Sequence, residues 1–265
     1  MPNTLLKTTL QKFVLTTALI GLSGIAAAQA GTVAALVGDN TLEHIDSASW
    51  KVTKTVKIDG LPARIVGMDV RPSDGMLYVL AEDGTVATVD PMTGKTAIKS
   101  KLDTVVPKGN TVTVDFNPVA DRMRVIGSEG SNLRANVDDG KVTVDGKLKF
   151  KDGDMHAGKS AMIIGGAYAN AMKGAKETAL YDIDAMGVLV KQAPPNDGVL
   201  TSIGMTGLDG KVVAFDIATG PDGDKGWVVQ KGMAYSIDLA SGKATQVGKI
   251  QGLTGDVRDI AILAN

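Results

Sequence analysis

The stretch that decides the fold is IVGMDVRPSDGMLYVLAEDGTVATVDPMTGKTAI, residues 65–98. It divides into short apolar segments at 65–72, 76–81, 85–90 and 95–98, each with the length and β-branched content of a strand. Each break carries Asp-Gly or Thr-Gly, residue pairs that tolerate the positive φ angles of tight hairpins. The stretch therefore predicts an antiparallel meander of four strands.

The same order of strands and turns recurs along the chain. It returns at 113–148, more loosely at 162–191, and again at 211–250. In the last copy, the turn at 238–243 repeats the turn at 90–95 almost residue for residue. Self-similarity at a fixed period is the signature of a repeat fold, so each copy is interpreted as one supersecondary unit.

The two ends of the mature chain each supply part of a unit. Residues 32–58 contain three strands without an innermost one, and residues 257–262 contain one strand without successors. Joined, they complete a ring whose last strand pairs with the first, which leaves no open sheet edge. We expect an all-β, single-domain β-propeller over 31–265 with five four-stranded blades. A β-sandwich, a ring of six blades and a helix over 157–175 are the alternatives, and Gly165-Gly166 argues against the helix.

The first thirty residues have the pattern of a cleavable signal peptide. Lys7 and Lys12 precede a short apolar run, 13–22, and small residues at Ala28 and Ala30 suit a signal peptidase. The run is interrupted by polar residues and glycine, which disfavours the alternative of an uncleaved membrane anchor. We expect cleavage before Gly31 and a periplasmic or extracellular protein.

Composition restricts the classes of partner that we expect for this protein. Without Lys7 and Lys12 the 28 basic residues become 26, against 29 acidic residues, so the mature net charge is about −3. Neither nucleic acid nor an anionic membrane surface is expected as a partner, because both require a clustered positive field. The chain has no cysteine, which excludes disulfides and thiolate metal sites. We expect a monomer that binds a small molecule or a protein.

The first strands of the repeats carry aspartates at equivalent places: Asp69, Asp115, Asp216 and Asp259, with Tyr168 near that position in the fourth repeat. The first strand of a propeller blade lines the central channel, so these carboxylates should converge. Converging carboxylates must be protonated, hydrogen-bonded or bound to a metal, and oxygen-only ligands suit Ca²⁺. Two interpretations stay open: capping of backbone N–H groups between blades, and a calcium site.

A pair of arginines marks a second candidate site. If Ile126 pairs with Asn132 in the hairpin of the third unit, Arg124 lies opposite Arg134 on one face. Like charges so placed require an anion between them. It could be a carboxylate from an adjacent blade, or the acid or phosphate group of a ligand. The candidate ligand-binding residues are Arg124, Arg134, Asn132, Asn117 and Tyr168.

Searches for other chemistry find little. His44 and His156 share no metal-ligand spacing and stand near no nucleophile signature, so a zinc site and a triad hydrolase are disfavoured. Met155-His156 is a poor copper site with two soft ligands. The segments 152–154 and 222–224 resemble calcium loops but lack the bidentate Glu, which indicates turns. No catalytic residue is assigned.

Several long runs carry a family resemblance. They are 114–125, 131–137, 166–170, 178–184 and 192–200, in this order along the chain. Together they resemble a bacterial family of exported proteins known as a domain of unknown function, the one numbered 4394. Ala169 stands where relatives tend to have Thr. The resemblance implies propeller-like repeats and export, and it implies no activity.

Two classes of function remain. The first is a non-enzymatic binding or scaffold protein, favoured because no acid, base and nucleophile set stands out. The second is a calcium-dependent hydrolase or lactonase with its site in the channel, which rests on analogy between propellers. Quinone-dependent oxidoreduction has weak support, because aromatic residues make up only 4% of the chain and such sites use stacked aromatics.

Overall fold

The protein is described by a computed structural model that covers Met1, residues 31–211 and residues 213–263. The predicted signal peptide, residues 1–30, lies outside the described residues except for Met1. Within the described part, regular structure consists of strands and one 3₁₀ turn at Pro195–Asp197. None of its helices has the length and apolarity needed to cross a membrane.

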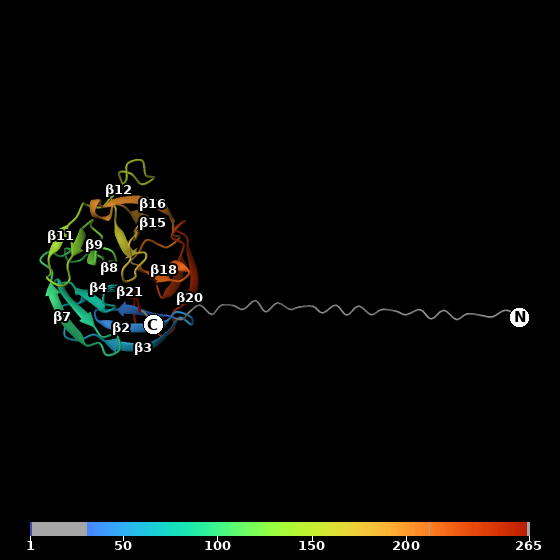
Figure 1. Cartoon of the computed structure of the whole chain (residues 1–265), viewed down its shortest axis with the longest axis horizontal. Helices are drawn as coiled ribbons and strands as arrows, with labels where there is room; N and C mark the ends of the chain where they lie inside the picture. The colour runs from blue at the N-terminus through green and yellow to red at the C-terminus, as the bar shows by residue number, and fades with distance from the viewer. Residues whose placement is uncertain (2–30, 212, 264–265) are drawn as a thin grey trace.

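The strands form five small sheets, which are the blades of a propeller (Figure 1). Blade 1 contains β1 (Thr32–Val37), β2 (Thr41–Asp46), β3 (Lys51–Lys57) and β21 (Val257–Leu263). Blade 2 contains β4 (Ile65–Val70), β5 (Leu77–Ala81), β6 (Thr85–Val89) and β7 (Thr96–Lys101). Blade 3 contains β8 (Val112–Asn117), β9 (Arg122–Gly127), β10 (Asn132–Ala135) and β11 (Val142–Val144). Blade 4 contains β13 (Ile163–Tyr168), β14 (Leu180–Asp184), β15 (Val188–Gln192) and β16 (Val199–Met205), with β12 (Lys149–Phe150) parallel to β16 at the outer edge. Blade 5 contains β17 (Ala214–Gly220), β18 (Gly223–Gln230), β19 (Met233–Ile237) and β20 (Ala244–Lys249).

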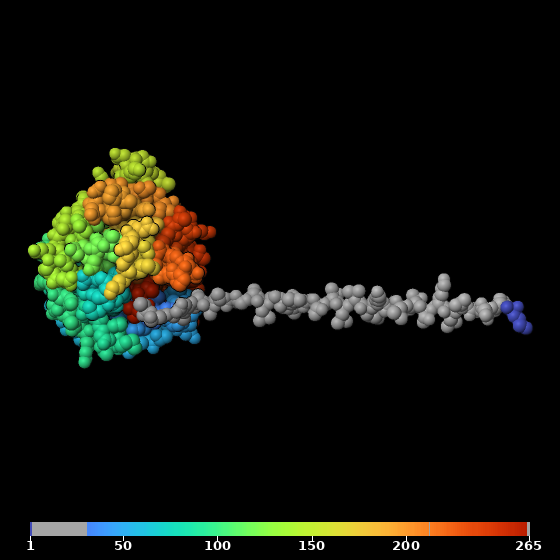
Figure 2. Space-filling view, in the orientation of Figure 1, coloured from blue at the N-terminus to red at the C-terminus, as the bar shows by residue number. Residues whose placement is uncertain are grey.

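The innermost strand of each blade contacts the innermost strands of its two neighbours. The contacts run β21 to β4, β4 to β8, β8 to β13, β13 to β17 and β17 back to β21. Figure 1 shows β4, β8 and β21 side by side near the centre, and Figure 2 shows the blades following one another around a round body. The five-bladed propeller predicted from the repeats is confirmed.

The ring closes through blade 1, as predicted. Strand β21 pairs antiparallel with β1, with Thr32 opposite Leu263 and Ala34 opposite Ala261. The last described strand thus occupies the inner position that the first three strands leave empty. This arrangement covers the edge of β1, at which another chain could otherwise pair.

Blade 4 shows where the repeat was harder to see. Its outer strand, β16, follows the 3₁₀ turn and lies beyond the end of the predicted unit at residue 191. The alternative of a helix over 157–175 is wrong, because β13 occupies the middle of that range and pairs with β14. The glycines at 165 and 166 lie in this strand and are buried.

A recurring glycine turn docks each of three blades onto the one before it. Gly94, Gly140 and Gly242 all have φ near +75°, between +74° and +79°. A Cβ on Gly94 would lie 1.9 Å from the carbonyl oxygen of Lys57 on β3, and one on Gly140 would lie 2.1 Å from that of Lys101 on β7. Glycine is required both for the left-handed backbone and for this close approach.

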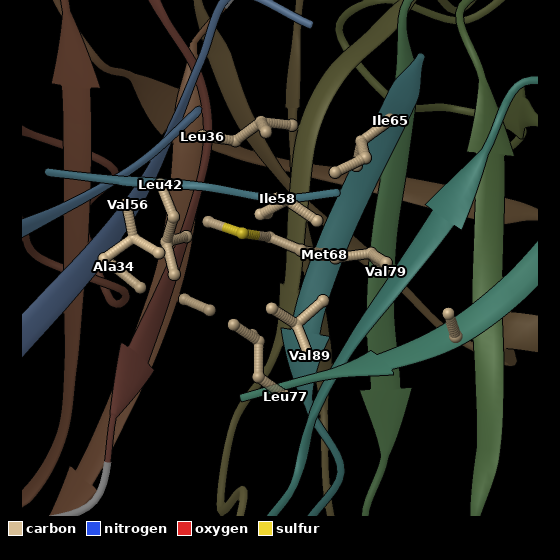
Figure 3. Close-up of a cluster of buried hydrophobic side chains, with 12 residues drawn as sticks. Ala34, Leu36, Leu42, Val56, Ile58, Ile65, Met68, Leu77, Val79 and Val89 are labelled. Carbon is tan, nitrogen blue, oxygen red and sulfur yellow. The ribbon is translucent and has the colours of Figure 1, made fainter. Parts of the chain in front are cut away.

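The hydrophobic core is divided into five clusters, one at each joint between neighbouring blades. Figure 3 shows the cluster between blades 1 and 2, in which Leu42 of β2 and Met68 of β4 point toward each other. Tyr78 and Phe116 pack edge to face between blades 2 and 3, and Trp50 and Trp227 do so between blades 1 and 5. Each blade is therefore stabilised mainly by its neighbours, as expected for a repeat protein.

Candidate functional site

The four channel aspartates lie on innermost strands and are buried, with exposed fractions between 4% and 8%. Each accepts a hydrogen bond from a backbone N–H of the next blade. The pairs are Asp69 with Phe116 at 2.7 Å, Asp115 with Tyr168 at 3.0 Å, Asp216 with Ile262 at 2.7 Å and Asp259 with Met68 at 2.8 Å. The carboxylates thus bind neighbouring blades to one another around the channel.

Three of these carboxylates also approach one another. One oxygen each of Asp69, Asp115 and Asp216 lies within 4.8 Å of the other two. Asp259 is outside this group and accepts the amides of Met68 at 2.8 Å and Ile260 at 3.0 Å. Burial raises the pKa of Asp69 and of Asp115 well above the usual range, and repulsion by neighbouring aspartates adds to it. Burial raises the pKa of Asp216 to about 6. A proton or a cation is therefore needed to hold these oxygens together.

Blade 4 interrupts the series of aspartates. Asp69 accepts a hydrogen bond from the backbone amide of Phe116, the residue after Asp115. In the same way, Asp115 accepts a hydrogen bond from the amide of Tyr168, the residue after Ala167. Ala167 is therefore the structural equivalent of Asp115, and it brings no carboxylate. Tyr168, which the sequence placed near this position, instead points into the joint between blades 3 and 4, where its side chain is fully buried.

Arg124 is the centre of the polar contacts in that joint. The predicted register is correct, because Asn132 pairs with Ile126 and Arg134 with Arg124. Asp145 bridges the two guanidinium groups, at 2.6 Å from Nη1 of Arg124 and 3.0 Å from Nη2 of Arg134. The anion is therefore a carboxylate, and it comes from the end of β11 in the same blade rather than from an adjacent blade.

Each guanidinium nitrogen of Arg124 also donates to a neutral side chain. Nε donates to the Tyr168 hydroxyl at 3.2 Å, Nη2 to Asn196 at 2.7 Å and Nη1 to Asn132 at 2.8 Å. The Asn132 amide donates to two backbone carbonyls, one of them that of Pro195 in blade 4. These contacts connect blades 3 and 4; ligand binding by these residues stays a prediction.

Asn117 lies apart from Arg124 in its hydrogen bonding. Its Oδ1 accepts the amides of Val119 at 2.9 Å and Ala120 at 2.8 Å, which caps the turn that follows β8. The side chain is half-buried. Its position is that of a turn-forming residue.

Asp182 is a buried carboxyl that the sequence analysis missed. It lies on β14, opposite Gly166, with its side chain fully buried and both oxygens lacking a hydrogen-bond partner among the described residues. Burial raises its pKa to about 8, although the nearby Arg124 opposes the shift. An Asp in the middle of the apolar run Leu180–Asp184, on the strand beside two glycines, was the available signal.

A second missed cluster joins the protruding loop 151–162 to β16; this loop stands out at the top of Figure 2. The Ser202 hydroxyl lies 2.9 Å from Nδ1 of His156 and 2.7 Å from Asp154. In a catalytic triad the carboxylate binds the ring nitrogen remote from the nucleophile, whereas Asp154 here binds the serine itself. These contacts hold the loop 151–162 against β16. Asp154, in the segment 152–154 that resembles a calcium loop, is one of the residues that make them.

A groove of about 700 Å³ opens between blades 1 and 2. Its floor includes Leu77 and Val89, which also belong to the core cluster of that joint (Figure 3). The exposed side chains of Met76 and Met92 line it as well. His44 lines the groove from blade 1, and its Nε2 lies 2.7 Å from the carbonyl oxygen of Pro91. His44 is therefore part of the joint between blades 1 and 2, whereas His156 lies in the loop 151–162.

Comparison with known proteins agrees with the fold. The model of a family described as "Domain of unknown function (DUF4394)" matches residues 41–261. A crystal structure of a structural genomics protein of unknown function from Bacteroides thetaiotaomicron VPI-5482 is similar at a TM-score of 0.55 and 15% identity. The match covers 89% of this chain and 65% of that one, so this chain spans less than two thirds of that relative.

Two designed proteins are more distant. The computationally designed Ika4 matches at a TM-score of 0.36 and 13% identity, over 73% of this chain and 96% of its own. The designed Ika8 matches at 0.37 and 14%, over 87% of this chain and 64% of its own. A search of curated proteins finds no match.

Proposed function

The chain belongs to the DUF4394 family, and on that premise we propose that it is a non-enzymatic binding propeller whose ligand occupies the groove between blades 1 and 2. The groove is the observation that carries this proposal. Its volume of about 700 Å³ lies within the roughly 300–1,000 Å³ typical of small-molecule sites.

The chemistry of the groove favours a largely apolar small molecule. Leu77 and Val89 belong both to the lining of the groove and to the hydrophobic core, which makes this part of the lining rigid. Two methionines provide adaptable side chains at the surface of the groove. His44, Asp90 and Lys95 supply polar groups at its edge. Such a combination of apolar walls and few polar groups is typical of binding sites.

The experiment fills the groove from its outer strand. Ala97 lines the groove, and the adjacent Ile98 does not, although both lie exposed on β7. With Nile red as a neutral apolar probe, we expect saturable fluorescence binding that A97W weakens about fivefold, the equivalent of about 1 kcal/mol. I98W is the matched control. Absence of saturable binding, or equal effects of both variants, would exclude the groove.

A second candidate is a calcium-dependent hydrolase or lactonase, which one observation favours: three carboxylate oxygens within 4.8 Å of one another. Oxygen ligands of this kind are those that Ca²⁺ prefers. Asp69, Asp115 and Asp216 would hold the ion, which would replace the protons that otherwise relieve their repulsion. Bound in the channel, the ion would polarise a carbonyl group.

Calorimetric titration with CaCl₂ tests this candidate. We expect saturable binding and a Tm that rises with calcium, since an ion at 100 times its Kd stabilises by about 2.7 kcal/mol. D115N should abolish both, while D39N, at an exposed aspartate, should change neither. A panel of lactones and esters then separates the candidates. Turnover that depends on calcium favours the hydrolase, and an inert, calcium-free protein excludes it.

We place the binding outside the cytoplasm, in the periplasm or beyond the cell. The pattern of residues 1–30 supports this, because two lysines precede a short apolar run that ends at small residues. The partner is a small molecule or a protein, and the protein acts as a monomer. N-terminal sequencing of the exported protein checks the cleavage before Gly31, and light scattering checks the monomer.

A further inference from the structure

A separate pocket of about 230 Å³ lies at the end of the channel where the innermost strands begin. Arg64 directly precedes β4, Thr111 directly precedes β8, and Arg258 is the second residue of β21. These three strands are neighbours in the ring. Three different blades therefore contribute to this pocket, which is distinct from the groove between blades 1 and 2.

The pocket brings two positive charges together. It is lined by Arg64, Arg258, Val66 and the segment 109–112, so its charged lining residues are both guanidinium groups. Burial lowers the pKa of Arg258, and repulsion by Arg64 lowers it further. Like charges that face one pocket are unfavourable unless an anion offsets them.

The carboxylates near these arginines compensate them only in part. Glu82 binds Arg64 through the single oxygen Oε1, at 3.1 Å from Nε and 2.7 Å from Nη2, which leaves Nη1 outside this ion pair. Asp39 is 3.9 Å from Arg258 and its side chain is 74% exposed. An exposed pair at this distance contributes little, because solvent screens it.

The arginines are nevertheless held in place. Nη1 of Arg258 donates to the carbonyl oxygens of Gly38 at 2.9 Å and Ile65 at 3.0 Å, which anchors the guanidinium between blades 1 and 2. The amide of Glu82 donates to the carbonyl oxygen of Arg64 at 2.9 Å, which fixes the start of β4. Anchored guanidinium groups lose less side-chain entropy on binding, and their planar forks match oxyanions.

The third wall is an open loop. Gly109 has φ of +86°, and nothing lies within 4 Å of the place where a Cβ would stand. The carbonyl oxygen and the amide of Thr111 both bind Ser128, which fixes the end of this loop. A small ligand can therefore approach the arginines from the side of Gly109.

From this geometry we propose that the pocket at the start of the innermost strands binds a small oxyanion, a carboxylate or phosphate group held by Arg64 and Arg258. The channel aspartates follow along the same strands, Asp259 directly after Arg258, and the oxyanion stays at the mouth beside the arginines. Its binding adds a bridge between blades 1 and 2.

Calorimetric titration at constant ionic strength tests the proposal with two probes, inorganic phosphate and succinate. We expect saturable binding of at least one, which identifies the preferred oxyanion. R64Q should weaken it about tenfold, because it removes the charge-assisted hydrogen bonds from the guanidinium fork to the oxyanion. R64K, which keeps the charge and loses the fork, should fall between R64Q and the natural protein.

The control is R122Q, which removes a guanidinium that donates to the carbonyl oxygen of Asp121 at the other end of blade 3, opposite Asn117, the last residue of β8. It should leave binding unchanged. R258Q is expected to abolish binding. Because Arg258 anchors two carbonyl oxygens, the Tm of this variant is measured as well. If R258Q does not fold, the result for R64Q decides. No saturable binding of either probe, or equal losses in R122Q and R64Q, would overturn the proposal.

Discussion

The joint between blades 1 and 2 and the joint between blades 3 and 4 occupy equivalent places in the ring and are built differently. The core of the first is apolar, with side chains such as Leu42 and Met68 packed against each other (Figure 3). The second has Arg124 at its centre, 2% exposed and bound to Asp145, Tyr168 and two asparagines.

The difference shows that one architecture tolerates two kinds of joint with different sensitivities. An apolar joint depends on volume, and a volume-conserving change costs little. A buried polar joint depends on complete pairing, because removing one member leaves the others without partners in a poorly solvated place. The apolar joint also opens into the groove in which we propose that a ligand binds.

The largest effect is expected from R124M. It removes the cation from the polar joint and leaves Asp145 with Arg134 alone, together with unpaired hydroxyl and amide groups. We expect a loss of about 3–5 kcal/mol in the free energy of unfolding, measured by urea denaturation. R122M, at an arginine near the surface, should cost below about 0.5 kcal/mol. Equal small losses in both variants would show that the polar joint does not stabilise the ring.

A somewhat smaller effect is expected from M68A in the apolar joint. Met68 is fully buried, so truncation should cost about 2–4 kcal/mol through lost burial and a residual cavity. M68L conserves the volume and should cost less than about 1.5 kcal/mol. Urea denaturation measures all three proteins. A conservative change as damaging as the truncation would contradict the distinction between the two joints.

A more gradual effect, spread over several pH units, concerns Asp182. Its folded pKa of about 8 exceeds the value of about 3.9 in an unfolded chain. Between these values the folded state holds a proton that the unfolded state lacks, so stability falls as pH rises, by at most about 1.4 kcal/mol per pH unit. It levels off above about pH 8.

D182N removes this titration and keeps the shape of the side chain. The other buried carboxyls titrate in both proteins, so the comparison is the difference between the two stability curves from pH 5 to pH 8. We expect the natural protein to lose stability relative to D182N over this range, as measured by urea denaturation at each pH. Parallel curves would show that Asp182 does not change protonation there.

Much of the architecture could be predicted from the sequence. The turn at 90–95 and its copy at 238–243 form the same hydrogen bonds, from the amides of Gly94 and Gly242 to the carbonyls of Asp90 and Asp238. Because local hairpin chemistry sets each blade, the repeat and the closing strand were visible in the chain. Register within a hairpin follows from turn length, so Arg124 opposite Arg134 was predictable as well.

Contacts beyond a single hairpin were not predictable in the same way. Asp145 lies at the end of a strand whose length no turn signal defined, and it was not recognised as the partner of Arg124. Asp182 is buried by blade 3, which the pattern of β14 alone does not reveal. The outer strand of blade 4 was missed because the 3₁₀ turn at Pro195–Asp197 replaces the usual hairpin.

The pairing of β1 with β21 has a consequence for how the molecule can be assembled and rewired. Blade 1 is complete only when Thr32 lies next to Leu263. Because this contact joins residues so far apart in the sequence, it has the largest entropy cost of closure, and we expect blade 1 to form last. The same proximity makes the ring suited to circular permutation. A short linker between these two residues would allow new termini in an exposed turn such as 73–75, and blade 1 would then fold from contiguous residues.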